Sequence, residues 1–255
     1  MPKGKSMQEE VVTTPIDLAQ FGLTGIFNCR GTIVSQRLAG RRVLFLFGER
    51  HNVMPFIRDN LLNALELDKL GALSCVGVEG HPTGDFPGAD TTRTFETLRV
   101  ALPDEEEIIE EMLRRFGRRR NFYFWKILTL LRPSLIIESV DDPDLCARAS
   151  DLEWQFLDRR REAIAWVLEK SDLFEHDNPD KKRTAAEKAI IQAQLEWAEH
   201  EVNLQRDAIF LQKLEALWGK TGTDRASVLN AGCSHQFRIA RQLPDEWSYY
   251  HIEQP

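Results

Sequence analysis

Two residues able to share a metal ion, a water molecule or a proton lie close together in this sequence. Glu49 and His51 follow residues 43–47, a continuously apolar run that predicts a strand covered on both faces. Residues two apart on an extended chain project to the same side, so this carboxylate and this imidazole can act together. The structural alternative is that Glu49 caps the following helix and that His51 packs at its start.

A second carboxylate and a second histidine also follow predicted strands. Glu79 comes directly after the apolar residues 76–78, where a carboxylate must be solvated, paired or coordinated to stay charged. His235 ends the segment NAGCSH, in which small residues predict a turn that exposes the imidazole at a sheet edge. The structural alternatives are an arginine partner for Glu79 and an ordinary hydrogen bond for His235.

The predicted elements bring these side chains to one edge of a sheet. Residues 53–69 allow a helix between the strands that precede Glu49 and Glu79, and this strand–helix–strand unit predicts a parallel pair. The carboxyl ends of parallel strands share one edge, so the two carboxylates should lie on the same side of the sheet. Upstream, two β-rich runs within residues 25–47 flank the turn-like LAGR and predict a hairpin.

Helical and strand patterns alternate over the rest of the chain. We expect helices at 104–120, 143–173, 184–218 and 236–242, strands at 135–137, 227–231 and 247–252, and a turn at 232–235. These elements predict an α/β fold: a central, mostly parallel or mixed sheet flanked by helices, with a long helical insertion between the third and last main strands. We expect a single domain over 1–255, with a flexible N-terminal segment at 1–20.

The composition argues against several classes of protein. A formal net charge of -7 repels phosphate backbones, so we expect no nucleic-acid partner. No stretch approaches the roughly 20 apolar residues of a membrane-spanning helix, and the first residues lack the apolar core of a secretory signal. We therefore expect a cytoplasmic protein without a membrane partner. Four widely spaced cysteines without a CxxC pair indicate reduced, mostly buried thiols.

Four segments taken together resemble one superfamily. FGERHN at 47–52, VGVEG at 76–80, NLQRDAIFLQKL at 203–214 and NAGCSH at 230–235 resemble the superfamily that contains erythromycin esterase, ChaN and TraB-like (Tiki-related) proteins. The resemblance implies one pocket built from a Gly-Glu-x-His turn, a second strand-end glutamate, a helical arginine and a late histidine. The matching positions are Glu49, His51, Glu79, Arg206 and His235.

This chain departs from part of the family pattern. Some members have a wider gap between the first glutamate and the histidine than the single residue Arg50 found here. The roles of the individual residues are therefore open, as is the participation of Arg50, His81 and Asp207. The resemblance implies esterase, metal-dependent protease or haem-binding activity, and a shared fold does not choose among them.

The leading expectation is a hydrolase of an ester or amide bond in a small-molecule or peptide substrate. The candidate metal ligands are His51, His235, Glu49 and Glu79, which either bind a divalent metal of open identity or orient a water directly. One of the two glutamates would be the base, and Arg206 would stabilise charge on a carbonyl oxygen or anchor a carboxylate. The alternative is a haem- or metal-binding protein without catalysis, with one of the two histidines as axial haem ligand. The oligomeric state stays open.

Overall fold

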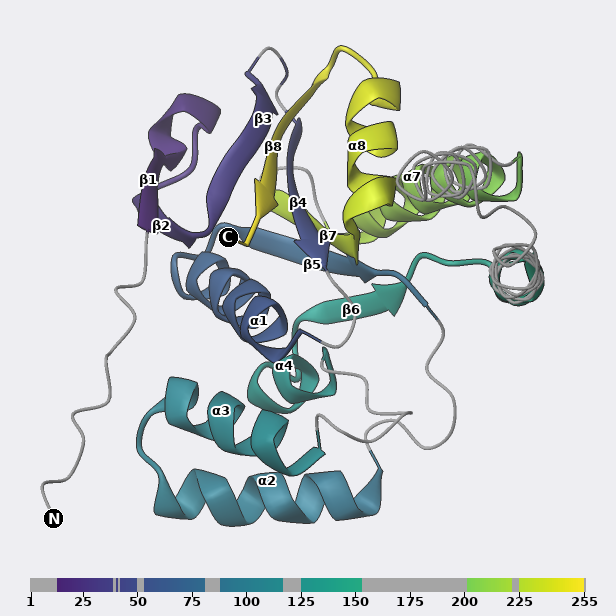
Figure 1. Ribbon diagram of the computed structural model, residues 1–255. Coiled ribbons are helices and arrows are strands. Elements are labelled where there is room, and N and C mark those ends of the chain that lie inside the picture. The colour runs from purple at the N-terminus through teal and green to yellow at the C-terminus, as the bar shows by residue number, and fades with distance from the viewer. Residues whose placement is uncertain are drawn as a thin grey trace, which may run out of the picture. The chain divides into compact units, whose positions relative to one another are not determined.

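The computed structural model describes residues 13–38, 40, 42–49, 53–80, 88–116, 125–152, 201–221 and 225–254 (Figure 1). The chain forms two compact units, which we call the first unit (Met1–Val140 with Leu211–Pro255) and the second unit (Asp141–Phe210). The expectation of a single domain over 1–255 stays a prediction. No helix in the described part of the chain is long and apolar enough to cross a membrane.

A six-stranded sheet with the strand order β3-β8-β4-β7-β5-β6 forms the centre of the first unit (Figure 1). Its strands are β3 (Thr32–Arg37), β4 (Arg42–Glu49), β5 (Leu73–Val78), β6 (Ile136–Ser139), β7 (Ala226–Gly232) and β8 (Trp247–Glu253). Strand β3 pairs antiparallel with β8, and the other neighbouring strands pair in parallel. The mixed, mostly parallel sheet flanked by helices confirms the predicted α/β fold.

Helices follow or cover these strands. In the first unit they are α1 (Met54–Lys69), α2 (Ala89–Ala101), α3 (Glu105–Phe116), α4 (Trp125–Leu131) and α8 (Cys233–Gln242). The long helical segment predicted between the third and last main strands includes the helical residues 143–152 and α7 (Glu201–Thr221). Residues 153–200 of that segment lie outside the described residues.

The central strands are buried over their full length, which explains their apolar sequences. Every residue of β5 and of β7 is buried, and so is every residue of β4 after Arg42. Strands covered on both faces by helices read as continuous apolar runs and not as alternating ones. The candidate carboxylates follow these apolar runs: Glu49 is the last residue of β4 and Glu79 follows β5 directly.

Helix α3 shows how the charge order of the sequence produces a local structure. Three glutamates occupy its first turn and two arginines its last turn, which complements the helix dipole. Its buried residues are Ile108, Ile109, Met112, Leu113 and Phe116, a single apolar stripe at helical spacing. The predicted helix 104–120 is confirmed for its first part, since α3 ends at Phe116 and residues 117–120 are not described.

Strands β1 (Thr13–Asp17) and β2 (Ile26–Arg30) form a separate antiparallel pair, joined through the short helix η1 (Leu18–Phe21).

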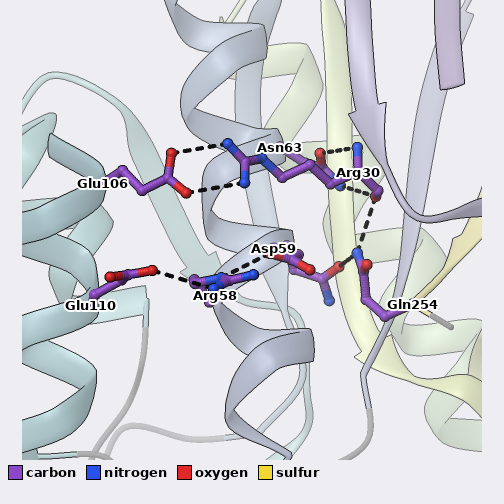
Figure 2. Close-up of polar contacts among 8 residues, drawn as sticks. Arg30, Arg58, Asp59, Asn63, Glu106, Glu110 and Gln254 are labelled. Carbon is purple, nitrogen blue, oxygen red and sulfur yellow. Dashed lines mark hydrogen bonds and ion pairs between the residues drawn. The ribbon is translucent and has the colours of Figure 1, made fainter. Parts of the chain in front are cut away.

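Polar side chains connect β2 to α1 and α3, as Figure 2 shows. We call Arg30, Arg58, Asp59, Asn63, Glu106 and Glu110 the polar layer. Arg30 donates to both carboxylate oxygens of Glu106, at 3.1 and 3.0 Å, and Asn63 both donates to and accepts from the Arg30 backbone. Arg58 pairs with Asp59 and Glu110.

The predicted hairpin within residues 25–47 is wrong. Strands β3 and β4 are not neighbours, because β8 lies between them, antiparallel to β3 and parallel to β4. A hairpin is inferred from residues close in the sequence, whereas β8 comes from about 200 residues downstream and competes for the same strand edges. Strand β3 is thereby an edge strand of the sheet, which agrees with its alternating exposure.

Two further local predictions need correction. The strand–helix–strand unit is present as β4-α1-β5, and its strands are parallel, but β7 lies between them. The predicted turn at 232–235 is helical from Cys233 onward, so α8 begins directly after β7. A strand that passes straight into a helix places the first side chains of that helix at the sheet edge.

Candidate active site

The two candidate carboxylates flank strand β7 at the carboxyl edge of the sheet. Glu49 is the last residue of β4 and lies in register with Gly232 of β7. Glu79 follows β5, and its backbone N–H donates to the Asn230 carbonyl of β7 at 2.9 Å. The predicted placement of both carboxylates at one edge is therefore confirmed. Because β7 separates their strands, the residues of β7 and of the start of α8 lie next to both of them.

His235 of α8 lies against Glu79. The distance between His235 Nε2 and Glu79 Oε1 is 3.4 Å, and both side chains are largely buried, with exposed fractions of 7% and 12%. The other carboxylate oxygen of Glu79 accepts the backbone N–H of Gly232 at 2.6 Å. The strand-end glutamate is thus held between a backbone donor and an imidazole. The sequence singled out both residues, and the structure brings them together.

Arg238 determines which nitrogen of His235 carries the proton. Its Nη2 lies 3.1 Å from His235 Nδ1, one helical turn away on α8. A guanidinium has only donors, so Nδ1 must be the acceptor in this contact. A neutral His235 therefore carries its proton on Nε2, the nitrogen that faces Glu79. Sequence reasoning did not single out Arg238, although its spacing from His235 on a predicted helix is the spacing at which helical side chains meet.

Glu49 is buried at the end of β4, and its described partners are neutral. The side-chain amide of Asn230 donates to Glu49 Oε2. The Cys233 thiol donates to the backbone carbonyl of Glu49 at 3.7 Å. A carboxylate with an exposed fraction of 8% needs such donors, because burial without a partner is strongly unfavourable. Glu49 and Glu79 therefore have different surroundings: Glu49 contacts an amide, and Glu79 contacts an imidazole.

Arg206 belongs to the second unit, where it pairs with Asp141. Its Nε donates to Asp141 Oδ1 at 3.1 Å and its Nη2 to Asp141 Oδ2 at 2.6 Å, a bidentate pair in which both side chains are buried. Its Nη1 lies 3.4 Å from Asn203 Oδ1, and its guanidinium stacks over the ring of Phe210. Such pairs hold an arginine in one geometry. The sequence did not predict the Asp141 partner, and the role of Arg206 at a substrate stays a prediction.

Other residues considered from the sequence are only partly placed. His51, together with Arg50 and His81, lies outside the described residues. Asp207 is fully buried in the second unit. The thiols predicted to be mostly buried divide into two groups: Cys29 and Cys75 are buried, and Cys146 and Cys233 are partly exposed. Burial raises the pKa of the Cys29 thiol and of the Cys75 thiol, which makes both poor nucleophiles.

Sequence reasoning missed the buried amides beside Glu49. Asn230 lies within the motif NAGCSH, but only the histidine of that motif was singled out. Asn60 and Asn63 are buried on α1 within the sequence NLLNALEL. An asparagine among apolar helix residues is a signal, because a buried amide must be hydrogen-bonded by specific neighbours.

The hydrogen-bonding neighbour of His235 Nδ1 does not fit a role of Nε2 as a ligand of a metal ion or of haem iron. A metal-ligating histidine usually donates an N–H from its second nitrogen to a carboxylate, a carbonyl or water. Here the second nitrogen faces Arg238, which accepts nothing. Among the described residues no three or more histidine, cysteine, aspartate or glutamate side chains gather as a metal site. The predicted metal and the alternative haem stay untested predictions.

A cavity of about 610 Å³ lies elsewhere in the first unit and holds none of the candidate catalytic residues. Its lining includes Lys69, Glu105 and Arg132, which pair with one another. The hydrogen bond from Arg132 is the main cause that lowers the pKa of Glu105 to about 2. These charged residues form ion pairs with Glu105, which is a structural role. We therefore assign the cavity no role in catalysis.

No protein-family model matches the sequence, and comparisons with curated proteins and with solved structures find no significant similarity.

Proposed function

We propose that this protein is a hydrolase of ester or amide bonds in which Glu79 and His235 form the catalytic pair. The observation that carries the proposal is the 3.4 Å contact between Glu79 Oε1 and His235 Nε2 at the carboxyl edge of a parallel sheet. Ligands of open α/β sheets bind outside this edge, so both side chains lie where a substrate is expected. The resemblance to a superfamily with esterase and protease members supports the same class of reaction.

Glu79 is the proposed general base. Its carboxylate takes a proton from a water molecule as the water oxygen bonds to the carbonyl carbon of the substrate. The protonated carboxyl then gives this proton to the leaving oxygen or nitrogen as the ester or amide bond breaks. The carboxylate is thereby regenerated, and the second proton of the water stays on the acid product. The Gly232 N–H fixes the other carboxylate oxygen and so orients the base.

His235 is proposed to act as a neutral hydrogen-bond donor. Because Arg238 occupies Nδ1, the proton on Nε2 points into the site. This N–H orients Glu79 in the resting enzyme and donates to the oxygen that becomes negative when water adds to the carbonyl. The role predicted for Arg206, which pairs with Asp141 in the second unit, stays a prediction. No metal is needed in this sequence of steps.

The proposal is tested with Glu79→Gln against a panel of ester and peptide substrates. Removing a general base lowers kcat by roughly 100- to 10,000-fold, and the amide keeps the size of the side chain. The matched control is Glu138→Gln, which changes an exposed glutamate within β6 and should leave kcat unchanged. A wild-type rate retained by Glu79→Gln would overturn the proposed base.

Metal dependence is measured on the same preparations. Under the proposed mechanism, EDTA treatment leaves kcat unchanged, and the purified protein shows no Soret band. Activity that is lost on chelation and restored by a divalent metal would replace the metal-free mechanism with the metal-dependent one. A stoichiometric Soret band that is lost in His235→Ala would favour the haem-binding alternative.

A further inference from the structure

A chain of buried side-chain amides ends at Glu49. Gln254 Nε2 donates to Asn60 Oδ1 at 3.1 Å, Asn60 Nδ2 donates to Asn230 Oδ1 at 3.0 Å, and Asn230 Nδ2 donates to Glu49 Oε2. The three amides come from the segment after β8, from α1 and from β7. All three side chains are buried. We call Gln254, Asn60 and Asn230 the amide chain.

Backbone carbonyls fix the direction of the amide chain. Gln254 Nε2 also donates to the Arg30 carbonyl at 3.1 Å, and Asn60 Nδ2 also donates to the Gly48 carbonyl at 3.1 Å. A carbonyl oxygen only accepts, so the NH₂ group of each amide must face it. The side-chain oxygens of Asn60 and Asn230 then face the N–H donor of the preceding amide. Figure 2 shows the Gln254 end, where Asn63 also donates to the Arg30 carbonyl.

This direction makes Glu49 the terminal acceptor of the chain. In each amide one N–H points along the chain toward the carboxylate, and hydrogen bonds arranged head to tail strengthen one another. The N–H of Asn230 needs an acceptor, and Glu49 Oε2 is that acceptor. Glu79 instead accepts from the Gly232 backbone N–H and lies against His235.

We infer that the amide chain is a positioning device that holds Glu49 Oε2 in one place as a hydrogen-bond acceptor. The part that this acceptor plays in hydrolysis rests on the proposed function, while the amide chain itself is independent of it. Gln254, Asn60 and Asn230 act through Glu49 and are positioning residues. In the bound state Glu49 orients a hydrogen-bond donor of the substrate or the attacking water.

The first test is spectroscopic and needs no substrate. Side-chain amide resonances of the ¹⁵N-labelled full chain are compared between wild type, Glu49→Gln and the control Glu79→Gln. Loss of the terminal charge should shift the NH₂ resonances of Asn230 most, those of Asn60 less and those of Gln254 least. Glu79→Gln should leave these three sets in place. Resonances of Asn60 and Gln254 that do not respond to Glu49→Gln would overturn the inference.

The second test is a double-mutant cycle on hydrolysis with Gln254→Met, which keeps the length of the side chain but cannot donate. Loss of a hydrogen bond at the far end should lower kcat by about 2- to 10-fold. In the Glu49→Gln background the same substitution should have no further effect, because Gln254 acts through Glu49. Equal effects in both backgrounds would identify a purely structural role and overturn the inference. A wild type without hydrolase activity would instead defeat the proposed function and leave the spectroscopic test decisive.

Discussion

The carboxyl edge of the sheet and the polar layer hold their carboxylates with different kinds of donor. In the polar layer, Glu106 pairs with Arg30 and Glu110 pairs with Arg58, so each acid faces a cation. At the sheet edge, a side-chain amide donates to Glu49, and a backbone N–H and an imidazole lie against Glu79. The arginine pairs contribute to cohesion between elements, whereas the amide and backbone donors fix the position of a single carboxylate oxygen.

The largest change in stability is expected from breaking the amide chain at its middle member. Asn60→Leu removes one acceptor of the Gln254 amide and the donors to the Asn230 carboxamide oxygen and the Gly48 carbonyl, and each unpaired buried group is costly. We expect the free energy of unfolding to fall by about 3 to 5 kcal/mol, measured by urea denaturation. The control Asn28→Leu changes an exposed residue of β2 and should cost far less. Equal losses in the two variants would show that the hydrogen bonds of Asn60 make no particular contribution to the free energy of unfolding.

A smaller effect concerns His251, a fully buried histidine of β8 whose Nε2 lies 3.4 Å from Glu253 Oε1. Burial lowers the pKa of His251 from 6.5 to about 4. Between these values the unfolded state binds a proton that the folded state does not, so stability falls as the pH drops from 6.5 to 4. The total loss is at most roughly 3 kcal/mol.

The pH dependence of His251 is measured by urea unfolding of wild type and His251→Leu at several pH values. The wild type should lose stability more steeply than the variant between pH 6.5 and pH 4, and the two slopes should agree above pH 7. Parallel slopes over the acidic range would show that His251 is charged in the folded protein.

The smallest effect is expected in the polar layer. Glu106→Gln removes a carboxylate from a partly exposed pair with Arg30, and such pairs contribute about 1 kcal/mol or less. Hydrolysis should be unchanged, because Glu106 contacts the guanidinium of Arg30, whereas Gln254 of the amide chain contacts the Arg30 backbone carbonyl. The measurement combines urea denaturation at low and high salt with the substrate panel. A loss of activity comparable to that of Glu79→Gln would contradict the separation of the two regions.

The fold class and the placement of the carboxylates were predictable because both depend on local patterns. The continuous apolar runs before Glu49 and Glu79 fixed two buried strands, and parallel strands have their carboxyl ends on one side. The position of His235 at the same edge followed in the same way. The order of the strands was not predictable, since β7 and β8 are inserted between strands that are close in the sequence.

The partners of the site residues were not predictable either. The proton position on His235 depends on Arg238, and the setting of Glu49 depends on Asn60, whose place opposite Asn230 is fixed only by the packing of α1 on the sheet. Asp141 as the partner of Arg206 is likewise a contact between residues 65 positions apart. Hydrogen-bond partners of this kind are determined by the tertiary structure. Residue types and their spacing in the sequence do not predict which individual residues become partners.

The position of β7 and β8 has a consequence for the order of events during synthesis. When β3, β4 and β5 have left the ribosome, the strands that separate them in the finished sheet have not yet been made. Sheets built from such distant segments fold slowly and expose unpaired strand edges in the meantime. Gln254 follows β8, so the amide chain that ends at Glu49 forms only after β8 has been made. The strand order therefore delays the final setting of Glu49 until long after Glu49 itself has been synthesised.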